Sequence, residues 1–216
     1  MLPVTDYDEK HFVFMATSNG TVKKTGLNNF ARQRSVGLRA IELDEDDELV
    51  GTAVTDGNKD VILVSTSGKT IRFNEADVRA MGRTARGVRG IKMAAECRMI
   101  SLIIPDDDTQ ILTVSETGYG KRTNIKDYPI YGRGGQGVIG MQTSERNGAV
   151  VGAVQVSEND EIMLISDKGT LVRTRVEEVS VQGRNTQGVR LIRLKEGEKL
   201  VGLEQVDEPN DEDLVI

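Results

Sequence analysis

The chain has 216 residues, of which 28 are Lys or Arg and 34 are Asp or Glu, and its formal net charge is −6. Its single cysteine, Cys97, excludes an internal disulfide framework and a zinc site built from cysteines. No apolar run reaches the roughly 18 residues of a membrane span, and the first residues lack the basic and apolar regions of a signal peptide. We therefore expect a soluble cytoplasmic protein that makes no membrane contact.

One pattern recurs four times along the chain, at intervals of about 50 residues. Each copy opens with an apolar run, and three landmarks stay in phase through all four copies. The first landmark is a turn glycine, at Gly20, Gly68, Gly118 and Gly169. The others are a second glycine, at Gly37, Gly87, Gly137 and Gly188, and an apolar pair, at 49–50, 99–100, 150–151 and 200–201. A repeat of this length is typical of a propeller blade or a solenoid unit.

Each copy can be divided into four short strands. The first is the apolar run, which suits a strand buried on both faces, and the glycine turn after it predicts a hairpin. The second strand is short and basic, at 22–25, 71–73, 120–123 and 172–175. A connector follows that is too short for a typical helix, so we expect a 3₁₀ turn or an irregular loop there. A loop with Arg and Gly then leads to the third strand, and the fourth strand starts at the apolar pair.

Four strands in each unit predict an all-β, propeller-like fold with four blades of about four antiparallel strands each. The alternative, a stack of separate hairpins, would leave many sheet edges open. We expect one domain over 1–208, with blades at 11–60, 61–110, 111–161 and 162–208. Residues 2–5 align with the close of a repeat at 53–56, so we expect residues 1–10 to be the closing strand of a preceding repeat and the chain to be part of a longer array. Residues 209–216 are expected to form an acidic tail.

The basic residues are concentrated in the same phase of every repeat. The segments 21–41, 69–92, 120–139 and 168–193 hold 22 of the 28 basic residues and only five of the 34 acidic ones. They comprise the second strand, the connector and the loop with Arg and Gly, which a propeller would place at equivalent positions around its body. We therefore expect a basic belt or arc, against the alternative of solvated faces balanced by neighbouring acids.

Glycine-rich loops beside basic residues suit phosphate groups, because small residues let backbone N–H groups approach them closely. The same glycines also suit tight turns at blade corners. The basic residues have no aromatic ladder beside them, and nothing resembles a recognition helix, so we expect contacts to the phosphates of duplex DNA without sequence preference. A convex belt would favour DNA bent around it. The candidate DNA-binding residues are Lys23, Lys24, Arg32, Arg34, Arg39, Arg72, Arg83, Arg86, Arg89, Lys121, Arg122, Arg133, Arg173, Arg175, Arg184 and Arg190.

Residues that could carry catalysis are scarce. The single histidine, His11, has no partner that would make it a general base or a metal ligand. The sequence has no nucleophile elbow, Walker loop or metal-spaced cluster, and the acidic run at 44–48 lacks the EF-hand pattern. We therefore expect no catalytic residue, no metal site and no cofactor in this chain.

Several strings of residues resemble one known family closely. They lie at 14–25, 78–82, 118–123, 169–176 and 183–189, and include Gly118-Tyr-Gly-Lys-Arg-Thr123 and Gly169-Thr-Leu-Val-Arg-Thr-Arg-Val176. These strings are similar to the C-terminal domain of the bacterial DNA gyrase A subunit, and the resemblance extends over residues 2–208. It implies a β-pinwheel in which neighbouring blades exchange strands, and in which DNA wraps around the perimeter to support negative supercoiling.

The resemblance also implies a non-catalytic module of a type II topoisomerase, whose catalytic residues, ATP site and Mg²⁺ lie in other parts of the holoenzyme. The implied partners are double-stranded DNA, the gyrase B subunit and the remainder of the gyrase A subunit. The implied location is the cytoplasm, in association with the nucleoid. We expect the isolated chain to be monomeric. The copies resemble the last four of the family's usual six blades, and the family's Gln-Arg-Arg-Gly-Gly-Lys-Gly box is absent. Rival interpretations are the equivalent domain of topoisomerase IV, a propeller that binds protein partners, and a propeller enzyme with a site at its central channel.

Overall fold

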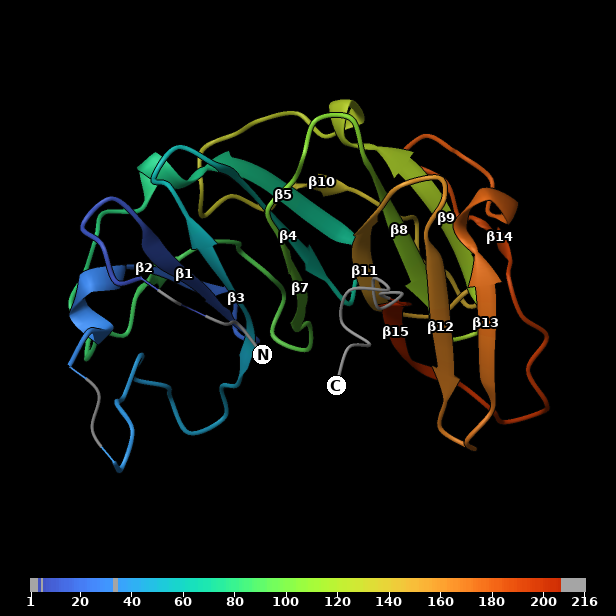
Figure 1. Cartoon of the computed structure of the whole chain (residues 1–216). Helices are drawn as coiled ribbons and strands as arrows, with labels where there is room; N and C mark the ends of the chain where they lie inside the picture. Colours follow the sequence, from blue (N-terminus) through green and yellow to red (C-terminus); the bar gives the residue numbers. More distant parts are fainter. Residues whose placement is uncertain (1–3, 5, 33–34, 207–216) are drawn as a thin grey trace, which may run out of the picture. The chain divides into compact units, whose positions relative to one another are not determined.

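The computed structural model describes residues 4, 6–32 and 35–206 (Figure 1). Within these residues the only helical elements are short 3₁₀ turns, at Leu27–Phe30, Glu75–Asp77, Ile125–Asp127 and Val176–Glu178. All four fall at the predicted connectors, so the fold is all-β, as the sequence predicts. None of the described helical elements has the length and apolar character needed to cross a membrane.

Four sheets follow the four repeats, and their paired strands are antiparallel. The first has the order β3-β1-β2-β6, with β1 at Phe12–Thr17, β2 at Thr21–Gly26, β3 at Leu49–Thr55 and β6 at Val88–Arg89. The second has the order β10-β5-β4-β7, with β4 at Asp60–Ser65, β5 at Lys69–Asn74, β7 at Met99–Ile103 and β10 at Val138–Ile139. The third has the order β11-β8-β9-β14, with β8 at Gln110–Ser115, β9 at Tyr119–Asn124, β11 at Val150–Val156 and β14 at Val189–Arg190. The fourth has the order β13-β12-β15, with β12 at Glu161–Ser166, β13 at Leu171–Arg175 and β15 at Leu200–Val206.

The hairpin that opens each repeat forms where the apolar run meets the turn glycine. In the third repeat, Ile111, Leu112 and Val114 are fully buried, as expected for a strand covered on both faces. Gly118 adopts a φ of +84° and donates its N–H to the carbonyl of Ser115 at 3.0 Å. A Cβ on Gly118 would also lie 2.7 Å from the carbonyl oxygen of Ile192, so both the turn and the close approach require glycine.

The third strand of a repeat does not pair within its own repeat. Instead, β6 pairs with β2 of the preceding repeat, where Val88 lies opposite Val22. In the same way β10 pairs with β5 and β14 pairs with β9. This exchange of strands between neighbouring repeats is the arrangement of a β-pinwheel, and it confirms the predicted fold class.

Two details differ from the prediction of about four strands in every blade. The fourth sheet has three strands in the described part of the chain, where β13 pairs only with β12. The described part of residues 35–48 contains no strand, although a third strand is expected there. Residues 6–10, predicted as part of a closing strand, are also not in a strand, and residues 1–3, 5 and the predicted tail at 209–216 lie outside the described residues.

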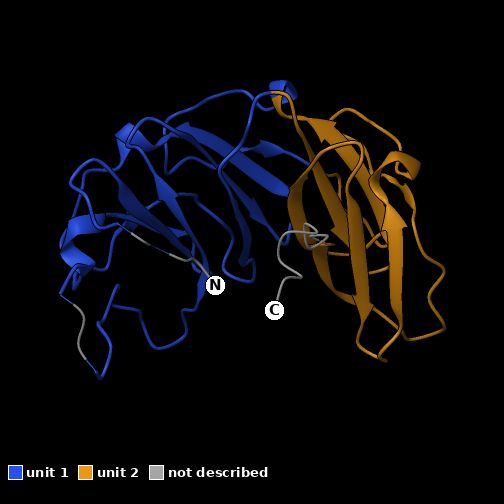
Figure 2. Ribbon diagram, in the orientation of Figure 1, with its two compact units in different colours: residues 1–107, 126–140 blue, residues 108–125, 141–216 orange. Residues whose placement is uncertain are grey.

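The chain forms two compact units (Figure 2). Unit 1 comprises residues 1–107 and 126–140, and unit 2 comprises residues 108–125 and 141–216. The prediction of one domain over 1–208 stays a prediction.

Each unit has its own apolar core, filled mainly by aliphatic side chains. In unit 1 the rings of Phe14 and Phe73 pack at a centroid distance of 6.5 Å among Val, Leu and Ile side chains. In unit 2 the core includes Leu112, Ile162 and Val176. The strand β3 contacts β7 in unit 1, and β11 contacts β15 in unit 2. We call β6, β10 and β14 the donated strands, because each pairs with a sheet of the preceding repeat. In its sheet, β6 lies at the edge away from β3, and β14 lies at the edge away from β11.

Candidate nucleic-acid interface

The structure divides the candidate DNA-binding residues into a buried group and an exposed group. Arg34 lies outside the described residues. The buried group lies on the second strands of the first three repeats and comprises Lys23, Lys24, Arg72, Lys121 and Arg122. The exposed or half-exposed group comprises Arg32, Arg39, Arg83, Arg86, Arg89, Arg133, Arg173, Arg175, Arg184 and Arg190.

Lys23 and Lys121 occupy the same position in the first and third repeats, and both are 0% exposed. The Lys23 ammonium group donates to the carbonyls of Ala40, at 2.6 Å, and Arg83. The Lys121 ammonium group donates to the carbonyls of Gly183, at 2.6 Å, and Arg184. Burial, with a smaller contribution from the nearby Arg83, lowers the pKa of Lys23 to about 8. Each lysine therefore holds the Arg- and Gly-containing loop of the following repeat.

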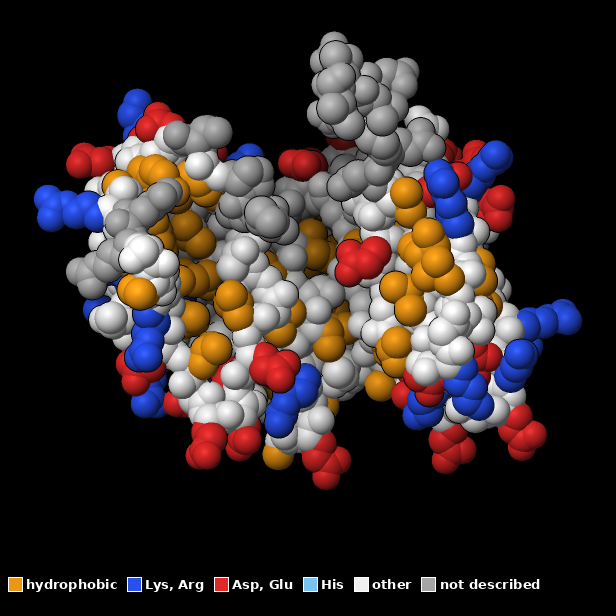
Figure 3. All heavy atoms as spheres, turned by 60° about the horizontal axis from the view of Figure 1, so that its bottom comes forward, with side chains coloured by type: hydrophobic (Ala, Val, Ile, Leu, Met, Phe, Trp, Pro, Cys, Tyr) orange, Lys and Arg blue, Asp and Glu red, His pale blue; other side chains and the backbone are white. Residues whose placement is uncertain are grey.

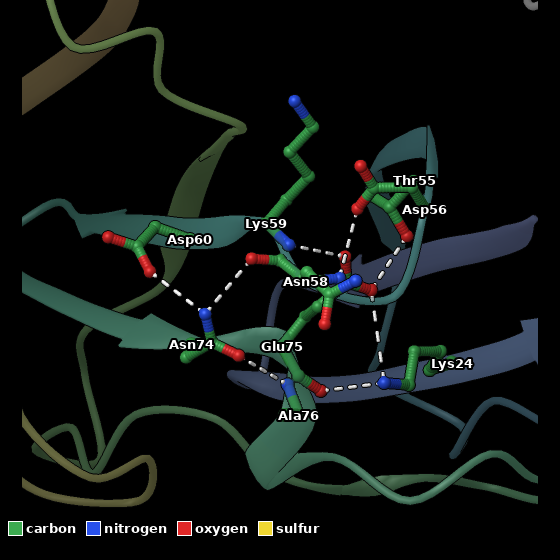
Figure 4. Close-up of polar contacts among 9 residues, drawn as sticks. All are labelled: Lys24, Thr55, Asp56, Asn58, Lys59, Asp60, Asn74, Glu75 and Ala76. Carbon is green, nitrogen blue, oxygen red and sulfur yellow. Dashed lines mark hydrogen bonds and ion pairs between the residues drawn. The ribbon is translucent and has the colours of Figure 1, made fainter.

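Lys24 belongs to a buried polar cluster in unit 1 that is centred on Glu75 (Figure 4). The Glu75 carboxylate accepts hydrogen bonds from the Thr55 hydroxyl at 2.7 Å and from the backbone N–H of Lys59 at 2.8 Å. The Lys24 ammonium group lies 3.9 Å from this carboxylate and donates to the Glu75 carbonyl at 2.9 Å. Lys24 also lies 5.1 Å from the centre of the Phe12 ring. It therefore joins the first repeat to the connector of the second.

Arg72 and Arg122 are the counterparts of Lys24 in the second and third repeats. The Arg72 guanidinium forms an ion pair with Asp60 at 2.8 Å. The Arg122 guanidinium donates to the carbonyls of Val179, at 2.6 Å, and Glu177, at 3.3 Å. Arg72 thus binds a carboxylate of the protein and Arg122 binds two of its main-chain carbonyls, so both side chains have a structural role.

These contacts correct the prediction for the five buried cations. Their charged groups are enclosed, and each donates to a carbonyl or a carboxylate of the protein, so none is open to a DNA phosphate. The second strand was expected to be exposed because it is basic. In the first three repeats it is covered instead, and there it is a central strand, paired with the first strand on one edge and with the donated strand on the other. In the fourth repeat β13 pairs only with β12 among the described strands, and Arg173 and Arg175 are exposed.

Three of the exposed arginines already have carboxylate partners. Arg86 lies 2.5 Å from Asp44 and 3.6 Å from Glu42 in unit 1. Arg173 forms an ion pair with Glu161, and Arg175 lies 3.6 Å from Glu177, in unit 2. Exposed ion pairs contribute little to stability, but they reduce the net positive charge that a phosphate would meet.

Other exposed arginines form no ion pair in the described part of the chain. They are Arg32, Arg39, Arg89, Arg133 and Arg190. Arg133 is tied to the fold, because it donates to the carbonyls of Asp77, at 2.9 Å, and Arg89, at 3.1 Å. The half-exposed Arg83 donates to the carbonyl of Arg39 at 3.4 Å, and Arg184 is also half-exposed.

A pair of basic residues stands at two of the donated strands. The first residue of each pair, Arg89 or Arg190, is among the predicted candidates, and the second, Lys92 or Arg193, is not. In unit 1, Arg89 on β6 is followed three residues later by Lys92, and both line a hollow of about 350 Å³ with Asn19 and Arg98. In unit 2, Arg190 on β14 is followed by Arg193 at the same spacing, and both line a hollow of about 540 Å³. The corresponding residues of the third repeat are Ile139, at the end of β10, and Gln142, so the basic pair occurs at β6 and β14 but not at β10.

Arg146, which the sequence did not single out, lines the hollow in unit 2 together with Tyr119. Its side chain contacts the Tyr119 hydroxyl, as does that of Arg190. The signal for Arg146 was weak, because it stands alone in a turn next to Glu145 and outside the basic segments.

Acidic and basic side chains lie beside one another on the face drawn in Figure 3, and they are not separated into areas of one sign. Exposed cations without carboxylate partners in the described part of the chain stand on β6 and β14, at Arg89 and Arg190.

The family described as the DNA gyrase C-terminal domain, with a beta-propeller fold, matches this chain at residues 11–56, 59–96, 109–157 and 160–207. The chain belongs to this family. The four matched segments coincide with the four repeats and extend over most of the sequence. The family relationship accounts for the pinwheel exchange of strands seen in both units.

Relatives in this family include the DNA gyrase A subunit of Salmonella typhimurium, which is 57% identical over 213 residues covering 99% of this chain and 24% of the relative. The DNA gyrase A subunit of Pseudomonas aeruginosa is 60% identical over 206 residues, covering 94% of this chain and 22% of the relative. The chain thus spans about a quarter of the length of these relatives.

Two solved structures have the same fold. A DNA gyrase A C-terminal domain matches with a TM-score of 0.81 and 28% identity, covering 93% of this chain and 67% of that one. The C-terminal domain of a DNA topoisomerase IV matches with a TM-score of 0.88 and 26% identity, covering 95% of this chain and 65% of that one.

Proposed function

We propose that this chain binds duplex DNA without sequence preference and bends or wraps it along the exposed basic residues of its donated strands. The observation that carries the proposal is a basic pair at the end of two of these strands, Arg89 with Lys92 after β6 and Arg190 with Arg193 after β14, which stands at equivalent places in the two units. None of these four residues forms an ion pair in the described part of the chain, so their charge is available to phosphates. Phosphate contacts of this kind fix position but carry no sequence information.

Membership of the gyrase family supports the wider assignment. We propose that the chain acts as a non-catalytic part of DNA gyrase, and that wrapping supports negative supercoiling by the whole enzyme. The proposed partners are the gyrase B subunit together with the remainder of the A subunit, and catalysis, ATP and Mg²⁺ belong to those other parts. The proposed location is the cytoplasm, in association with the nucleoid. A role in topoisomerase IV is less well supported, because the relatives at 57% and 60% identity are gyrase proteins.

The test is the salt dependence of binding to a short duplex, measured by fluorescence anisotropy. If the chain contacts Z phosphates, a plot of log K against log salt should have a slope of about −0.9Z. Arg89→Gln and Arg190→Gln should each weaken binding evenly across DNA sequences and reduce the steepness of the slope by about 1. Lys59→Gln is the matched control, because this exposed lysine extends away from the Glu75 cluster and lies outside the basic segments (Figure 4).

Absence of binding at low salt, or an affinity that salt does not change, would contradict the DNA-binding proposal. It would favour the rival interpretation of a propeller that binds protein partners. A second assay separates bending from simple binding: a nicked plasmid is ligated in the presence of the chain, and the linking number of the product is measured. Wrapping shifts this number, and the sign of the shift gives the handedness of the wrap.

A further inference from the structure

Two arginines converge on one tyrosine in unit 2. Tyr119, the first residue of β9, is only 5% exposed. Its hydroxyl oxygen accepts hydrogen bonds from Arg146 Nε at 3.3 Å and from Arg190 Nη2 at 2.9 Å. The two guanidinium groups lie 4.8 and 5.4 Å from the centre of the Tyr119 ring. The tyrosine thus contacts each arginine through both its oxygen and its ring.

The arginines retain most of their hydrogen-bonding capacity. A guanidinium group has five N–H donors, and the contact with Tyr119 uses one donor from each. Neither Arg146 nor Arg190 forms an ion pair in the described residues, and the neighbouring Glu145 does not pair with Arg146. Both arginines are exposed and line the hollow of about 540 Å³, which also includes Arg193. The hollow therefore offers concentrated positive charge and free donors, with no carboxylate paired to them.

This arrangement is specific to the third repeat. At the position of Tyr119, immediately after the turn glycine, the other repeats have Thr21, Lys69 and Thr170. Arg146 lies in the turn that precedes the last strand, and at its position in that turn the other repeats have Asp46, Glu96 and Gly197. The tyrosine and the added arginine therefore occur together in a single repeat.

We propose that Tyr119, Arg146 and Arg190 form a clamp that binds one phosphate of the DNA backbone. This inference rests on the proposed function and identifies a particular contact within it. The two guanidinium groups supply the charged donors, and such donors suit phosphate oxygens because they can bind them in pairs. Tyr119 is a positioning residue: its oxygen and ring hold both arginines in place, which reduces the conformational freedom they lose when a phosphate binds.

A double-mutant cycle on the 216-residue chain tests whether both arginines act on the same phosphate. Arg146→Gln and Arg190→Gln should each weaken duplex binding, and the double variant should lose less affinity than the sum of the single losses. The pair Arg146→Gln with Arg89→Gln is the comparison, because Arg89 lies in the other unit and should give additive losses. Lys59→Gln again serves as the charge-matched control. All the substituted side chains are exposed, and thermal melting checks that each variant is folded.

Tyr119→Phe tests the positioning role without changing the charge. It should weaken binding by about two- to tenfold, the effect of losing hydrogen bonds, and leave the slope of the salt plot unchanged. A second readout is spectrophotometric titration of the tyrosines, because the hydrogen bonds from Arg146 and Arg190 lower the pKa of Tyr119. The phenol that ionises early should be absent in Tyr119→Phe, and its pKa should rise in Arg146→Gln.

The outcomes separate this inference from the proposed function. If the unmodified chain binds no duplex, the proposed function fails. If it binds with the expected salt dependence but Arg146→Gln behaves like Lys59→Gln, or Arg146 and Arg190 act additively, the clamp is wrong and DNA binding stands. If Tyr119→Phe binds as tightly as the unmodified chain, the tyrosine does not position the arginines.

Discussion

Unit 1 and unit 2 hold their donated strands in the same way but with different buried groups. In both, a fully buried lysine of the second strand binds the loop that leads to the donated strand. Lys121 binds two carbonyls of that loop, whereas Lys23 binds one, that of Arg83, and the carbonyl of Ala40 in its own repeat. The residue that follows each lysine differs: Lys24 lies beside the buried carboxylate of Glu75, whereas Arg122 binds main-chain carbonyls and the side chain of Gln110. At the position of Glu75, unit 2 has the buried Val176.

The comparison indicates which features the exchange of strands requires. A cation that binds a carbonyl of the next repeat is common to both units, but β5 pairs with β10 with Ile71 at the equivalent position, so this cation is not needed for every exchange. The carboxylate occurs only in unit 1. In unit 1 Lys24 lies near the Glu75 carboxylate. In unit 2 the guanidinium group of Arg122 has several N–H donors and binds main-chain carbonyls without a carboxylate partner among the described residues. Substitutions that alter one unit and leave the other intact test this difference.

The largest expected effect is that of Glu75→Ala in unit 1. The change removes the acceptor of the Thr55 hydroxyl and the Lys59 N–H, and it leaves the Lys24 ammonium group buried without its carboxylate. Removing one partner of a buried charged pair typically costs about 3–5 kcal/mol of unfolding free energy. Denaturant unfolding measures the loss, with the exposed Glu45→Ala as the control. A loss no greater than that of Glu45→Ala would show that the carboxylate is not needed in unit 1.

A smaller effect is expected from Lys121→Met in unit 2. The methionine fills much of the same space but leaves the carbonyls of Gly183 and Arg184 without this donor, which should cost about 1–3 kcal/mol. Hydrogen exchange should show faster opening near β14. The control is Ile71→Met at the equivalent position of β5, where a hydrophobic exchange should cost less than about 1.5 kcal/mol. Equal losses for the two variants would mean that the buried lysine contributes only its packing.

The smallest effect concerns acid stability in unit 2. The hydroxyls of Ser166 and Thr170 each donate to Glu198 at 2.5 Å, and they lower its pKa to about 2. Because the pKa of Glu198 in the folded chain lies below its ordinary value of 4.5, the ionised carboxylate stabilises the folded state. This stabilisation is complete at pH values above 4.5 and is lost as the pH falls toward 2.

The denaturation midpoint should therefore fall between about pH 5 and pH 2, and Glu198→Gln should make this fall shallower. Glu196→Gln, which alters an exposed carboxyl group in the same turn, is the control. In the corresponding turn of the third repeat, the buried Asn147 accepts from the N–H and the hydroxyl of Ser144 and does not titrate. Identical acid profiles for the chain and Glu198→Gln would show that the Glu198 carboxylate does not stabilise unit 2.

Much of the fold could be predicted because its signals are local. The apolar runs, the glycines with positive φ and the short connectors each depend on a few adjacent residues, and the hairpins and 3₁₀ turns form where these signals stand. The partner of the third strand is different. Segments such as Val88–Arg89 are two residues long and carry no pattern that selects β2 over a strand of their own repeat. The exchange was expected only from the family resemblance.

The burial of the five cations on the second strands does not follow from their charge, because a basic residue is usually exposed. The repeats contained a contrary signal: the position of Lys23 and Lys121 is occupied by Ile71 in the second repeat, and an aliphatic residue there indicates a covered position. Arg146 was missed for the opposite reason. It stands outside the basic segments, and only the folded chain brings it to Tyr119 and Arg190.

The exchange of strands has a consequence for how the molecule is made. The first sheet remains incomplete until Val88 and Arg89 of the next repeat have left the ribosome, and the second and third sheets wait in the same way for β10 and β14. During synthesis, each new repeat must therefore finish its predecessor before it is finished itself, so one edge strand is unpaired at every stage. The repeats of this family should consequently fold in sequence order. The sheet that still lacks its donated strand, and whose edge is therefore open to wrong pairing, should be a later one at each stage of synthesis.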